Sequence, residues 1–249
     1  MKRFIFIALM CFPLAVWGAT IHAIIGADTN ASDIGESVFV DEMQISDELH
    51  NIASHTGLTL KLTILDGDRC SPYTLFSELK KLDIKSDDVV LFYWSGHGFR
   101  TYDKGNTNPW PNLYFTEYSK GVDLKGVFDK LKAKHPRLLI AMADTCNSFT
   151  SWGPSMVRKA PRPFVSPETV TRNYRELFLN TRRHIIASSS KPGEYSFGNN
   201  YDGGLFTSSF LSNFSREIHS NAIPNWDHVF SQSASHLNSQ HPQWLIAPY

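Results

Sequence analysis

The chain alternates between two hydrophobic patterns, one typical of buried strands and one typical of helices. Short apolar runs that end at turn-forming residues predict strands. These runs are 20–26, 58–65, 89–94, 138–143 and 184–188. Between them, apolar residues recur three or four positions apart, which predicts helices. The predicted helices are 38–54, 71–82, 122–134, 168–179, 205–214 and 226–237.

The order of these elements predicts the fold class. Strands separated by single helices form βαβ units, so we predict an α/β protein whose mostly parallel central sheet carries helices on both faces. Continuous apolar strands agree with this, because both faces of a parallel sheet are covered. Ser71 followed by Pro72 indicates the start of one helix, and Gly57 indicates the end of another. In such sheets, sites form just beyond the carboxyl ends of the strands.

The first residues have the pattern of an export signal. Lys2 and Arg3 precede an apolar stretch at 4–16, which is too short to span a bilayer comfortably. Gly18 and Ala19 follow as the small residues that signal peptidase prefers. We therefore expect cleavage after one of these two residues.

This prediction divides the chain into a signal peptide, residues 1–19, and one domain, residues 20–249. We expect an exported protein, periplasmic or secreted, with no stable membrane insertion after cleavage. An uncleaved membrane anchor is the alternative. Lipid attachment through Cys11 is disfavoured, because the preceding Met10 is larger than the small residue usual at that place.

The composition is that of an ordinary globular protein. The chain has 249 residues, of which 42% are hydrophobic and 19% are charged, and its formal net charge is zero. A balanced charge argues against a general nucleic-acid binder and against a membrane-surface binder. The sequence therefore predicts no nucleic-acid partner.

Reactive side chains follow two of the apolar strands. The stretch SGHG places His97 between two glycines, and the stretch DTC places Asp144 and Cys146 after a later strand. If these strands are neighbours, their ends lie about 5 Å apart, so the histidine and the cysteine can face one substrate carbonyl. A cysteine nucleophile needs a base such as histidine and hydrogen-bond donors for the oxyanion. The backbone N–H of Gly98 is a candidate donor.

These motifs resemble those of the caspase-like cysteine peptidases, above all metacaspases and bacterial caspase-like proteins. The resemblance rests on an apolar strand with Ser-Gly-His-Gly and, roughly fifty residues later, an apolar strand with Asp-x-Cys. The stretches TIHAIIGADTN and GGLFT extend it over most of the chain. One departure is Asn147, which follows the cysteine where the metacaspase pattern has His-Ser-Gly. This departure puts the local loop in doubt more than the reactive pair.

The resemblance implies a three-layer αβα sandwich with a strand order resembling 2-1-3-4. It also implies a cysteine endopeptidase acting on proteins or peptides, in which His97 activates Cys146. The backbone N–H groups of Gly98 and Cys146 would form the oxyanion hole. A catalytically inactive binding module of the same fold is the alternative. A serine hydrolase acting through Ser95 is disfavoured, because position 93 is Tyr where a nucleophile elbow needs Gly.

Acidic residues near the predicted site favour a basic side chain just before the cleaved bond. Caspases that cleave after Asp supply an arginine from the loop after the first strand, but the matching loop, 26–36, has no Arg or Lys. In the metacaspases that the chain resembles, the residue two before the cysteine lines a pocket for a basic side chain; here it is Asp144. Asp28 and Asp202 are further candidates, since carboxylates attract Arg and Lys. The alternative for Asp144 is a cap on the turn after its strand.

The segment 149–183 is long and rich in proline and arginine. Loops of this length are usually functional or disordered. Related enzymes are cut here, between their large and small parts. We therefore predict partial self-cleavage between Arg158 and Arg162, with an ordinary surface loop as the alternative.

The remaining motifs predict structural roles. In the implied strand order, Cys70 and Cys146 lie roughly 14 Å apart, too far for a disulfide, so we expect Cys146 to be a free thiol. We expect no cofactor; some metacaspases use calcium, but the stretch 66–68 lacks the rest of a calcium loop and predicts a turn. The aromatic stretch 110–115 predicts a hairpin over the core, with a wall of the substrate groove as the alternative.

Overall fold

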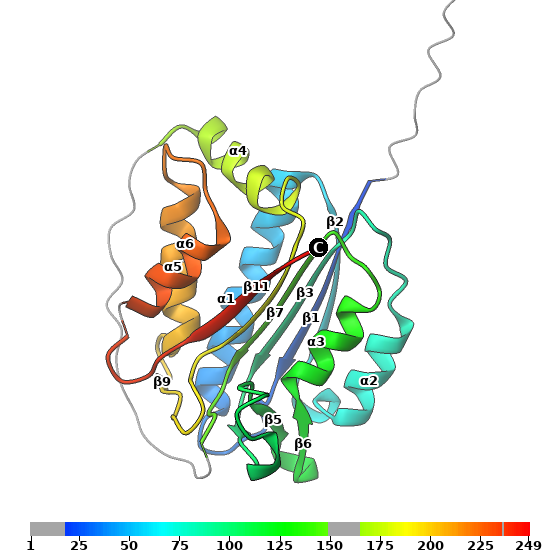
Figure 1. Cartoon of the computed structure of the whole chain (residues 1–249), viewed down its shortest axis with the longest axis vertical. Coiled ribbons are helices and arrows are strands. Elements are labelled where there is room, and N and C mark those ends of the chain that lie inside the picture. Colours follow the sequence, from blue (N-terminus) through cyan, green and yellow to red (C-terminus); the bar gives the residue numbers. More distant parts are fainter. Residues whose placement is uncertain (1–17, 149–164, 236) are drawn as a thin grey trace, which may run out of the picture.

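A six-stranded, mostly parallel sheet forms the centre of the computed structural model, which describes residues 18–148, 165–235 and 237–249 (Figure 1). Its strands, in their order across the sheet, are β11 (Gln243–Pro248), β8 (Arg183–Ser188), β7 (Leu138–Asp144), β3 (Val89–Ser95), β1 (Thr20–Ala27) and β2 (Thr59–Leu65). Neighbouring strands are parallel except for β11, which is antiparallel to β8. The order β2-β1-β3-β7 confirms the predicted sheet.

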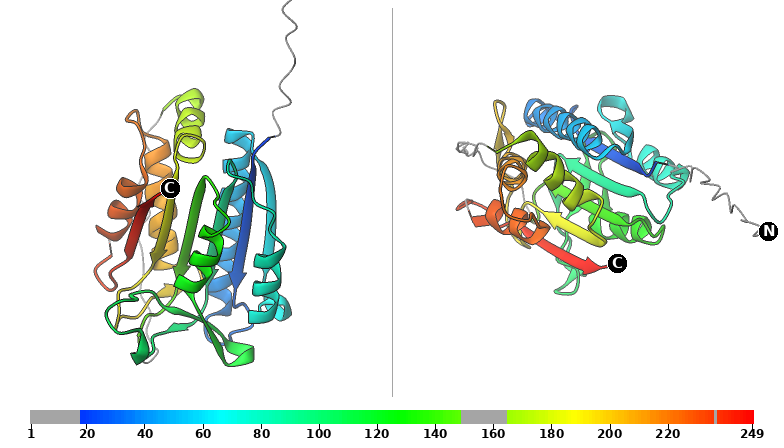
Figure 2. Two further views of the ribbon diagram at one scale, coloured as in Figure 1. Left: turned by 45° about the vertical axis from the view of Figure 1, so that its right-hand side comes forward. Right: turned by 90° about the horizontal axis from the view of Figure 1, so that it is seen from above.

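Helices cover both faces of this sheet, which confirms the three-layer sandwich (Figures 1 and 2). The larger layer contains α1 (Gly35–Thr56), α4 (Pro167–Phe178), α5 (Leu205–Ile218) and α6 (Trp226–Ser235). The other layer contains α2 (Pro72–Lys81) and α3 (Leu124–Lys132). The two layers leave the carboxyl ends of the parallel strands free to form a site.

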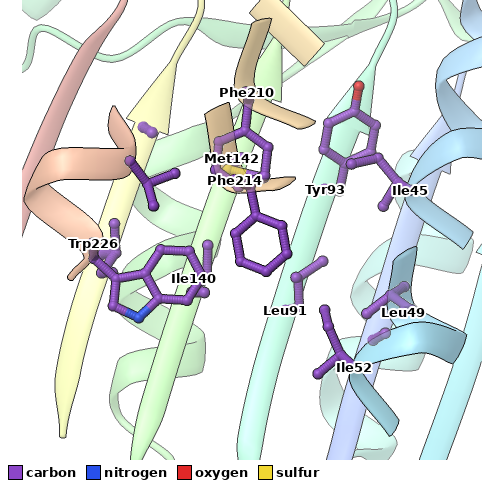
Figure 3. Packing of buried hydrophobic residues seen from close by; sticks show 14 of the residues in the cluster. Ile45, Leu49, Ile52, Leu91, Tyr93, Ile140, Met142, Phe210, Phe214 and Trp226 are labelled. Atoms are coloured by element: carbon purple, nitrogen blue, oxygen red, sulfur yellow. The ribbon is translucent and has the colours of Figure 1, made fainter. Parts of the chain in front are cut away.

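Strand β3 shows why the central strands are uninterrupted apolar runs. All of its residues are buried, and successive side chains point to opposite faces of the sheet. Leu91 and Tyr93 belong to the core beneath α1 and α5, whereas Phe92 and Trp94 belong to the core beneath α2 and α3. Figure 3 shows the first of these cores, where Phe214 of α5 faces Leu91. A strand covered on both sides has no solvent face and therefore no polar alternation.

The signals predicted for the start of α2 and for the end of α1 are confirmed, whereas α1 starts earlier than predicted. Ser71 accepts a hydrogen bond from the Thr74 N–H at 3.0 Å, and Pro72 is the first residue of α2. Gly57 ends α1 with a φ of 77°, a left-handed conformation that favours glycine. Helix α1 begins at Gly35, earlier than predicted. The hydrophobic pattern does not mark this start, because the residues before Val38 in the helix are not apolar.

The predicted hairpin over the core is confirmed as part of a small antiparallel sheet. This sheet consists of β4 (Gly98–Phe99), β5 (Asn112–Phe115) and β6 (Lys120–Asp123). Leu113 and Phe115 are buried in the core beneath α2 and α3. The helix start predicted at 122 is wrong: Val122 belongs to β6, and α3 begins after Asp123, which caps it by accepting from the Lys125 N–H.

The hydrophobic pattern does not predict β11 or the short hairpin of β9 (Gly198–Asn199) and β10 (Gly203–Gly204). The residues of β11 are half-buried or exposed on both faces, and the strand ends in proline. It therefore shows neither an apolar run nor alternation. The hairpin strands are too short for any pattern and consist largely of glycine.

Residues 66–68 form the predicted turn, which continues into a single 3₁₀ turn at Gly67–Arg69. Within the three described ranges, no helix combines the length and the apolar character needed to cross a membrane. Residues 1–17 of the predicted signal peptide and the predicted cleavage site at 158–162 lie outside the described residues.

Cys70 and Cys146 lie beyond the carboxyl ends of different strands. Strand β2 precedes Cys70, β7 precedes Cys146, and β1 and β3 lie between those two strands. Both cysteines are free, as predicted for Cys146. Cys70 is 3% exposed, and burial raises the pKa of its thiol. Cys146 is half-buried at the edge of the sheet.

These environments predict different reactivities toward alkylating agents. Iodoacetamide should modify Cys146 in the native protein and leave Cys70 unmodified, because the thiolate is the reactive form and protein atoms shield Cys70. Peptide mass spectrometry of native and urea-unfolded samples would measure both sites. Equal modification of the two cysteines in the native protein would contradict the structure.

Candidate active site

Glycine is required on both sides of His97, in the loop that follows β3. Gly96 has a φ of 156°, and a Cβ there would lie 2.8 Å from the Cβ of Asp28. A Cβ on Gly98 would lie 2.1 Å from the hydroxyl oxygen of Thr145. Any larger residue would push this loop away from its neighbours. The glycines therefore allow the histidine loop to lie directly against the loop that follows β7.

The pairing of β3 with β7 brings these two loops together. Ser95 and Asp144, the last residues of the two strands, are register partners. Beyond them, the Gly96 N–H donates to the Asp144 carbonyl at 3.4 Å, and the Thr145 hydroxyl donates to the Gly96 carbonyl at 2.8 Å. The histidine and cysteine loops thus leave the sheet from neighbouring strand ends, as predicted.

His97 pairs with Asp33, a residue that the sequence analysis does not select for the site. Nε2 of His97 lies 2.9 Å from Oδ1 of Asp33, and the two side chains are 22% and 64% exposed. Burial raises the pKa of Asp33, but the hydrogen bond and charge of His97 outweigh it and lower that pKa overall. Asp33 is therefore an anion at neutral pH and accepts the proton of Nε2, which leaves Nδ1 as the second functional nitrogen.

The thiol of Cys146 contacts the backbone of Ser196. The Ser196 N–H donates to Sγ at 3.3 Å, and Sγ donates to the Ser196 carbonyl at 3.7 Å. Burial raises the pKa of the Cys146 thiol, the Ser196 N–H opposes this, and the charge of Asp144 adds to it. Cys146 is therefore a neutral thiol in this state, and it makes no hydrogen bond with His97.

His97 and Cys146 line the same cavity, with a volume of about 330 Å³. We call it the acidic cavity, because three aspartates are among the residues that line it. The residues that carry the following argument are Asp33, Asp41, Ser95, His97, Asp144 and Cys146. The cavity therefore combines the predicted reactive pair with one predicted acid, Asp144, and two acids that were not predicted.

Asp144 lies at the buried side of the acidic cavity. Its Oδ1 accepts from the Ser196 hydroxyl at 2.6 Å, and its Oδ2 accepts from the N–H and the hydroxyl of Thr207 at 2.9 and 2.8 Å. Burial raises its pKa, although these donors oppose the shift. These partners come from the β8–β9 connection and from α5, so the carboxylate links remote segments.

Asp41 is the second buried acid of the acidic cavity. Its Oδ2 accepts from the Ser95 hydroxyl at 2.6 Å, and its Oδ1 accepts from the Gly204 N–H at 2.8 Å. Burial, and then the charge of Asp144, raise its pKa well above the ordinary value. The sequence contains a signal that could have identified Asp41. This residue falls on the apolar stripe of α1 between Val38 and Ile45, where a buried carboxylate is rare and indicates a specific role.

The glycines of β10 allow the two acids to lie this close to the backbone. A Cβ on Gly204 would lie 2.1 Å from Oδ2 of Asp144 and 3.0 Å from Oδ2 of Asp41. A Cβ on Gly203, whose φ is 79°, would lie 2.1 Å from Oδ1 of Asp41. Glycine is therefore required at both positions if Asp41 and Asp144 are to keep these places in the acidic cavity.

Asp28 and Asp202, the other predicted substrate-binding acids, do not line the acidic cavity. Asp28 is buried and accepts hydrogen bonds from the N–H and hydroxyl of Thr116, so it fixes the loop after β1. Asp202 lies in the turn between β9 and β10, where its carboxylate accepts from the Asn199 amide at 3.4 Å. The structure thus gives both residues positions in turns and loops.

Asn147, the departure from the metacaspase pattern, has a structural explanation. Its side-chain amide donates to the carbonyls of Pro109 at 2.7 Å and Ser190 at 3.2 Å. Its backbone N–H donates to the Glu194 carbonyl at 2.9 Å. Asn147 therefore joins the cysteine loop to the two loops beside it.

The described residues contain no group of three or more His, Cys, Asp or Glu side chains placed to hold a metal ion. The buried acids of the acidic cavity, Asp41 and Asp144, instead receive hydrogen bonds from hydroxyl and backbone donors. Such an arrangement suits the recognition of an organic cation, which brings its own donors to carboxylate oxygens.

Comparisons with known proteins agree with this geometry. The chain is similar to a crystal structure of protein GSU0716 from Geobacter sulfurreducens, with 12% sequence identity, a TM-score of 0.54, and coverage of 92% of this chain and 93% of the other; this likeness concerns the fold alone. No curated protein matches the sequence. The family model of the caspase domain matches residues 74–245, which include His97 and Cys146. The chain therefore belongs to the caspase-domain family of cysteine peptidases.

Proposed function

We propose that the protein is a cysteine endopeptidase that uses His97 and Cys146 and cleaves after Lys or Arg. One observation carries the proposal: both residues line a cavity that also contains the buried acids Asp41 and Asp144. The reactive groups supply the chemistry of peptide hydrolysis. The acids supply a preference for a cationic side chain beside the cleaved bond.

The proposed reaction begins with the neutral thiol of Cys146. When a peptide enters, Nδ1 of His97 takes the thiol proton and Sγ attacks the carbonyl carbon. The backbone N–H groups of Gly98 and Cys146 bind the resulting oxyanion. The C–N bond then breaks, His97 protonates the leaving amine, and a thioester remains. Water, deprotonated by His97, hydrolyses the thioester, releasing the carboxylic acid and restoring the thiol.

Asp33 supports this reaction by holding His97. Because its anionic carboxylate accepts the Nε2 proton, it selects the tautomer in which Nδ1 is the base. It also stabilises the imidazolium that forms after the thiol loses its proton. Asp33 is therefore a positioning residue in the proposal.

The preference for Lys or Arg rests on the two buried acids. Asp41 and Asp144 receive hydrogen bonds from neutral donors, and no described Lys or Arg forms an ion pair with them. A guanidinium or ammonium group entering the acidic cavity would supply the missing positive charge. An acidic side chain in the same place would lose its water and meet like charges, so it is disfavoured.

A peptide-binding module without catalysis is the second candidate. The observation in its favour is that the thiol of Cys146 is hydrogen-bonded to Ser196 and its pKa is raised, whereas His97 is hydrogen-bonded to Asp33. The two proposed catalytic residues are therefore not hydrogen-bonded to each other. In either case, the export signal predicted at 1–19 leads us to propose a periplasmic or secreted protein.

Replacing either reactive residue distinguishes these candidates. Cys146→Ala and His97→Ala should each lower kcat/KM for a fluorogenic arginine peptide by at least about a thousandfold, because each removes a group that takes part in bond making. Cys70→Ala is the matched control and should keep activity, since Cys70 lies outside the acidic cavity. Circular dichroism would show that the folds are intact. Near wild-type activity in Cys146→Ala would disprove the mechanism.

The acids predict specificity that depends on pH. In peptides that differ at the residue before the cut, Arg and Lys should be cleaved faster than Leu, Asn or Asp. Asp41→Asn and Asp144→Asn should each lower kcat/KM for the Arg peptide by about 10- to 100-fold and leave the Leu peptide nearly unchanged.

The sign of the pH effect follows from the raised pKa values of both acids. Below the raised pKa, a carboxyl group is protonated and attracts a cation less, so the Arg-to-Leu ratio should fall as the pH falls. Preferred cleavage after Asp or Asn would overturn the charge argument. An unchanged preference in Asp144→Asn would remove that residue as its cause.

Asp33→Asn tests the positioning of His97. This change keeps the shape but removes the charge that holds the imidazole, so kcat should fall by about tenfold or more while KM stays within about twofold. Asp68→Asn, in an exposed acid of a nearby loop, is the control. A rise in KM at constant kcat would assign Asp33 to substrate binding instead.

A further inference from the structure

A second cavity, of about 400 Å³, lies beside the cysteine loop. We call it the arginine cavity. Its walls come from the turn that follows β4 and from the loop that follows β8. The lining residues used below are Arg100, Gly105, Pro109 and Gly193. None of the residues of the acidic cavity lines it, so it is a separate recess.

Three hydrogen bonds attach both walls of the arginine cavity to the residues after Cys146. The Arg100 N–H donates to the Ser148 carbonyl at 2.9 Å, and the Gly193 N–H donates to the Asn147 carbonyl at 2.8 Å. The side-chain amide of Asn147 donates to the Pro109 carbonyl at 2.7 Å. The arginine cavity is therefore built onto the cysteine loop itself.

Arg100 gives the arginine cavity an uncompensated positive charge. The residue is 6% exposed, its Nη2 donates to the Gly105 carbonyl, and its buried Nη1 has no hydrogen-bond partner within the described part of the chain. The neighbouring Lys104 is paired with Asp123 at 2.6 Å, whereas no carboxylate among the described residues forms a salt bridge with Arg100. A buried guanidinium without a counter-anion is costly, so the site favours an incoming carboxylate.

The position of this cavity indicates which part of a peptide reaches it. Asp144 lies before Cys146 and binds the side chain on the amino side of the cut. Asn147 and Ser148 follow Cys146 and support the arginine cavity. The strand β4 also leads from His97, which must protonate the leaving amine, directly to Arg100. The peptide that leaves with that amine is thus directed toward the arginine cavity.

We infer that the arginine cavity binds an acidic side chain, Glu or Asp, located within the first few residues after the cleaved bond. The inference rests on the proposed function and adds a second determinant of substrate choice. Preferred sequences would then carry a basic residue before the cut and an acidic residue after it. The two opposite charges would also fix the direction in which the peptide lies across the site.

The test compares peptides with Arg before the cut and Glu, Gln or Lys at each of the first three later positions. At one of these positions, the kcat/KM of the wild-type protein should be about tenfold higher for the Glu peptide than for the Gln peptide. The kcat/KM for the Lys peptide should be lower than that for the Gln peptide. Sodium chloride at high concentration should shrink this ratio. Equal rates for Glu and Gln at all three positions would overturn the inference without any mutation.

Variants assign the effect to Arg100. Arg100→Gln should reduce the Glu-to-Gln ratio to about one, and Arg100→Lys should keep part of it, because the charge remains but the planar fork is lost. Arg182→Gln, in an exposed arginine paired with Asp87 at the opposite end of the sheet, should leave the ratio unchanged. A ratio that survives in a folded Arg100→Gln protein would disprove the role of Arg100.

A separate measurement distinguishes failure of this inference from failure of the proposed function. Fluorescence anisotropy with the Cys146→Ala protein would compare binding of the uncut Glu and Gln peptides. Cleavage of the Gln peptide with equal Glu and Gln rates leaves the peptidase standing and rejects the cavity assignment. Absence of all cleavage, together with tighter binding of the Glu peptide, rejects the peptidase and supports the cavity assignment.

Discussion

The site depends on the register between β3 and β7. Ser95 and Asp144 end these strands as partners, so one contributes a hydroxyl and the other a carboxylate to the same cavity. A shift by one residue would turn the side chains of a strand to the other face of the sheet. The core resists such a shift, because Tyr93 pairs with Met142 over one layer and Trp94 pairs with Ala143 over the other. The packing of both faces therefore fixes the chemistry at the edge.

Carboxyl groups around one cavity have pKa values shifted in opposite directions because their surroundings differ. Asp33 is largely exposed and faces an imidazole, so its pKa is lowered. Asp41 is buried beside Asp144, and its pKa is raised. The same functional group thus pairs with an imidazole in one place and, in the proposed function, binds a cationic side chain in another. Solvent access and the sign of the nearest charge decide between these roles.

The fold and the placement of His97 and Cys146 at neighbouring strand ends could be predicted because each rests on a local pattern. Apolar runs marked the parallel strands, and the motifs around His97 and Cys146 marked two strand ends. Asp41 was not predicted for a physical reason: it lies in the second turn of α1, and only the packing of that helix shows that this side chain reaches the cavity. The role inferred for Arg100 could not be predicted from the sequence either, because only the folded structure shows that no carboxylate of the described residues pairs with it.

Gly203 and Gly204 have a consequence for any redesign of the proposed substrate preference. The proposed selectivity of the acidic cavity would depend partly on residues that have no side chain, since the two acids occupy the volume that a methyl group would need. Mutant libraries that vary the cavity-lining side chains but keep Gly203 and Gly204 will keep the space that the two carboxyl groups occupy. Libraries that vary the turn will displace both acids at once. A change in the proposed specificity therefore has to alter the acid pair together with its glycine turn.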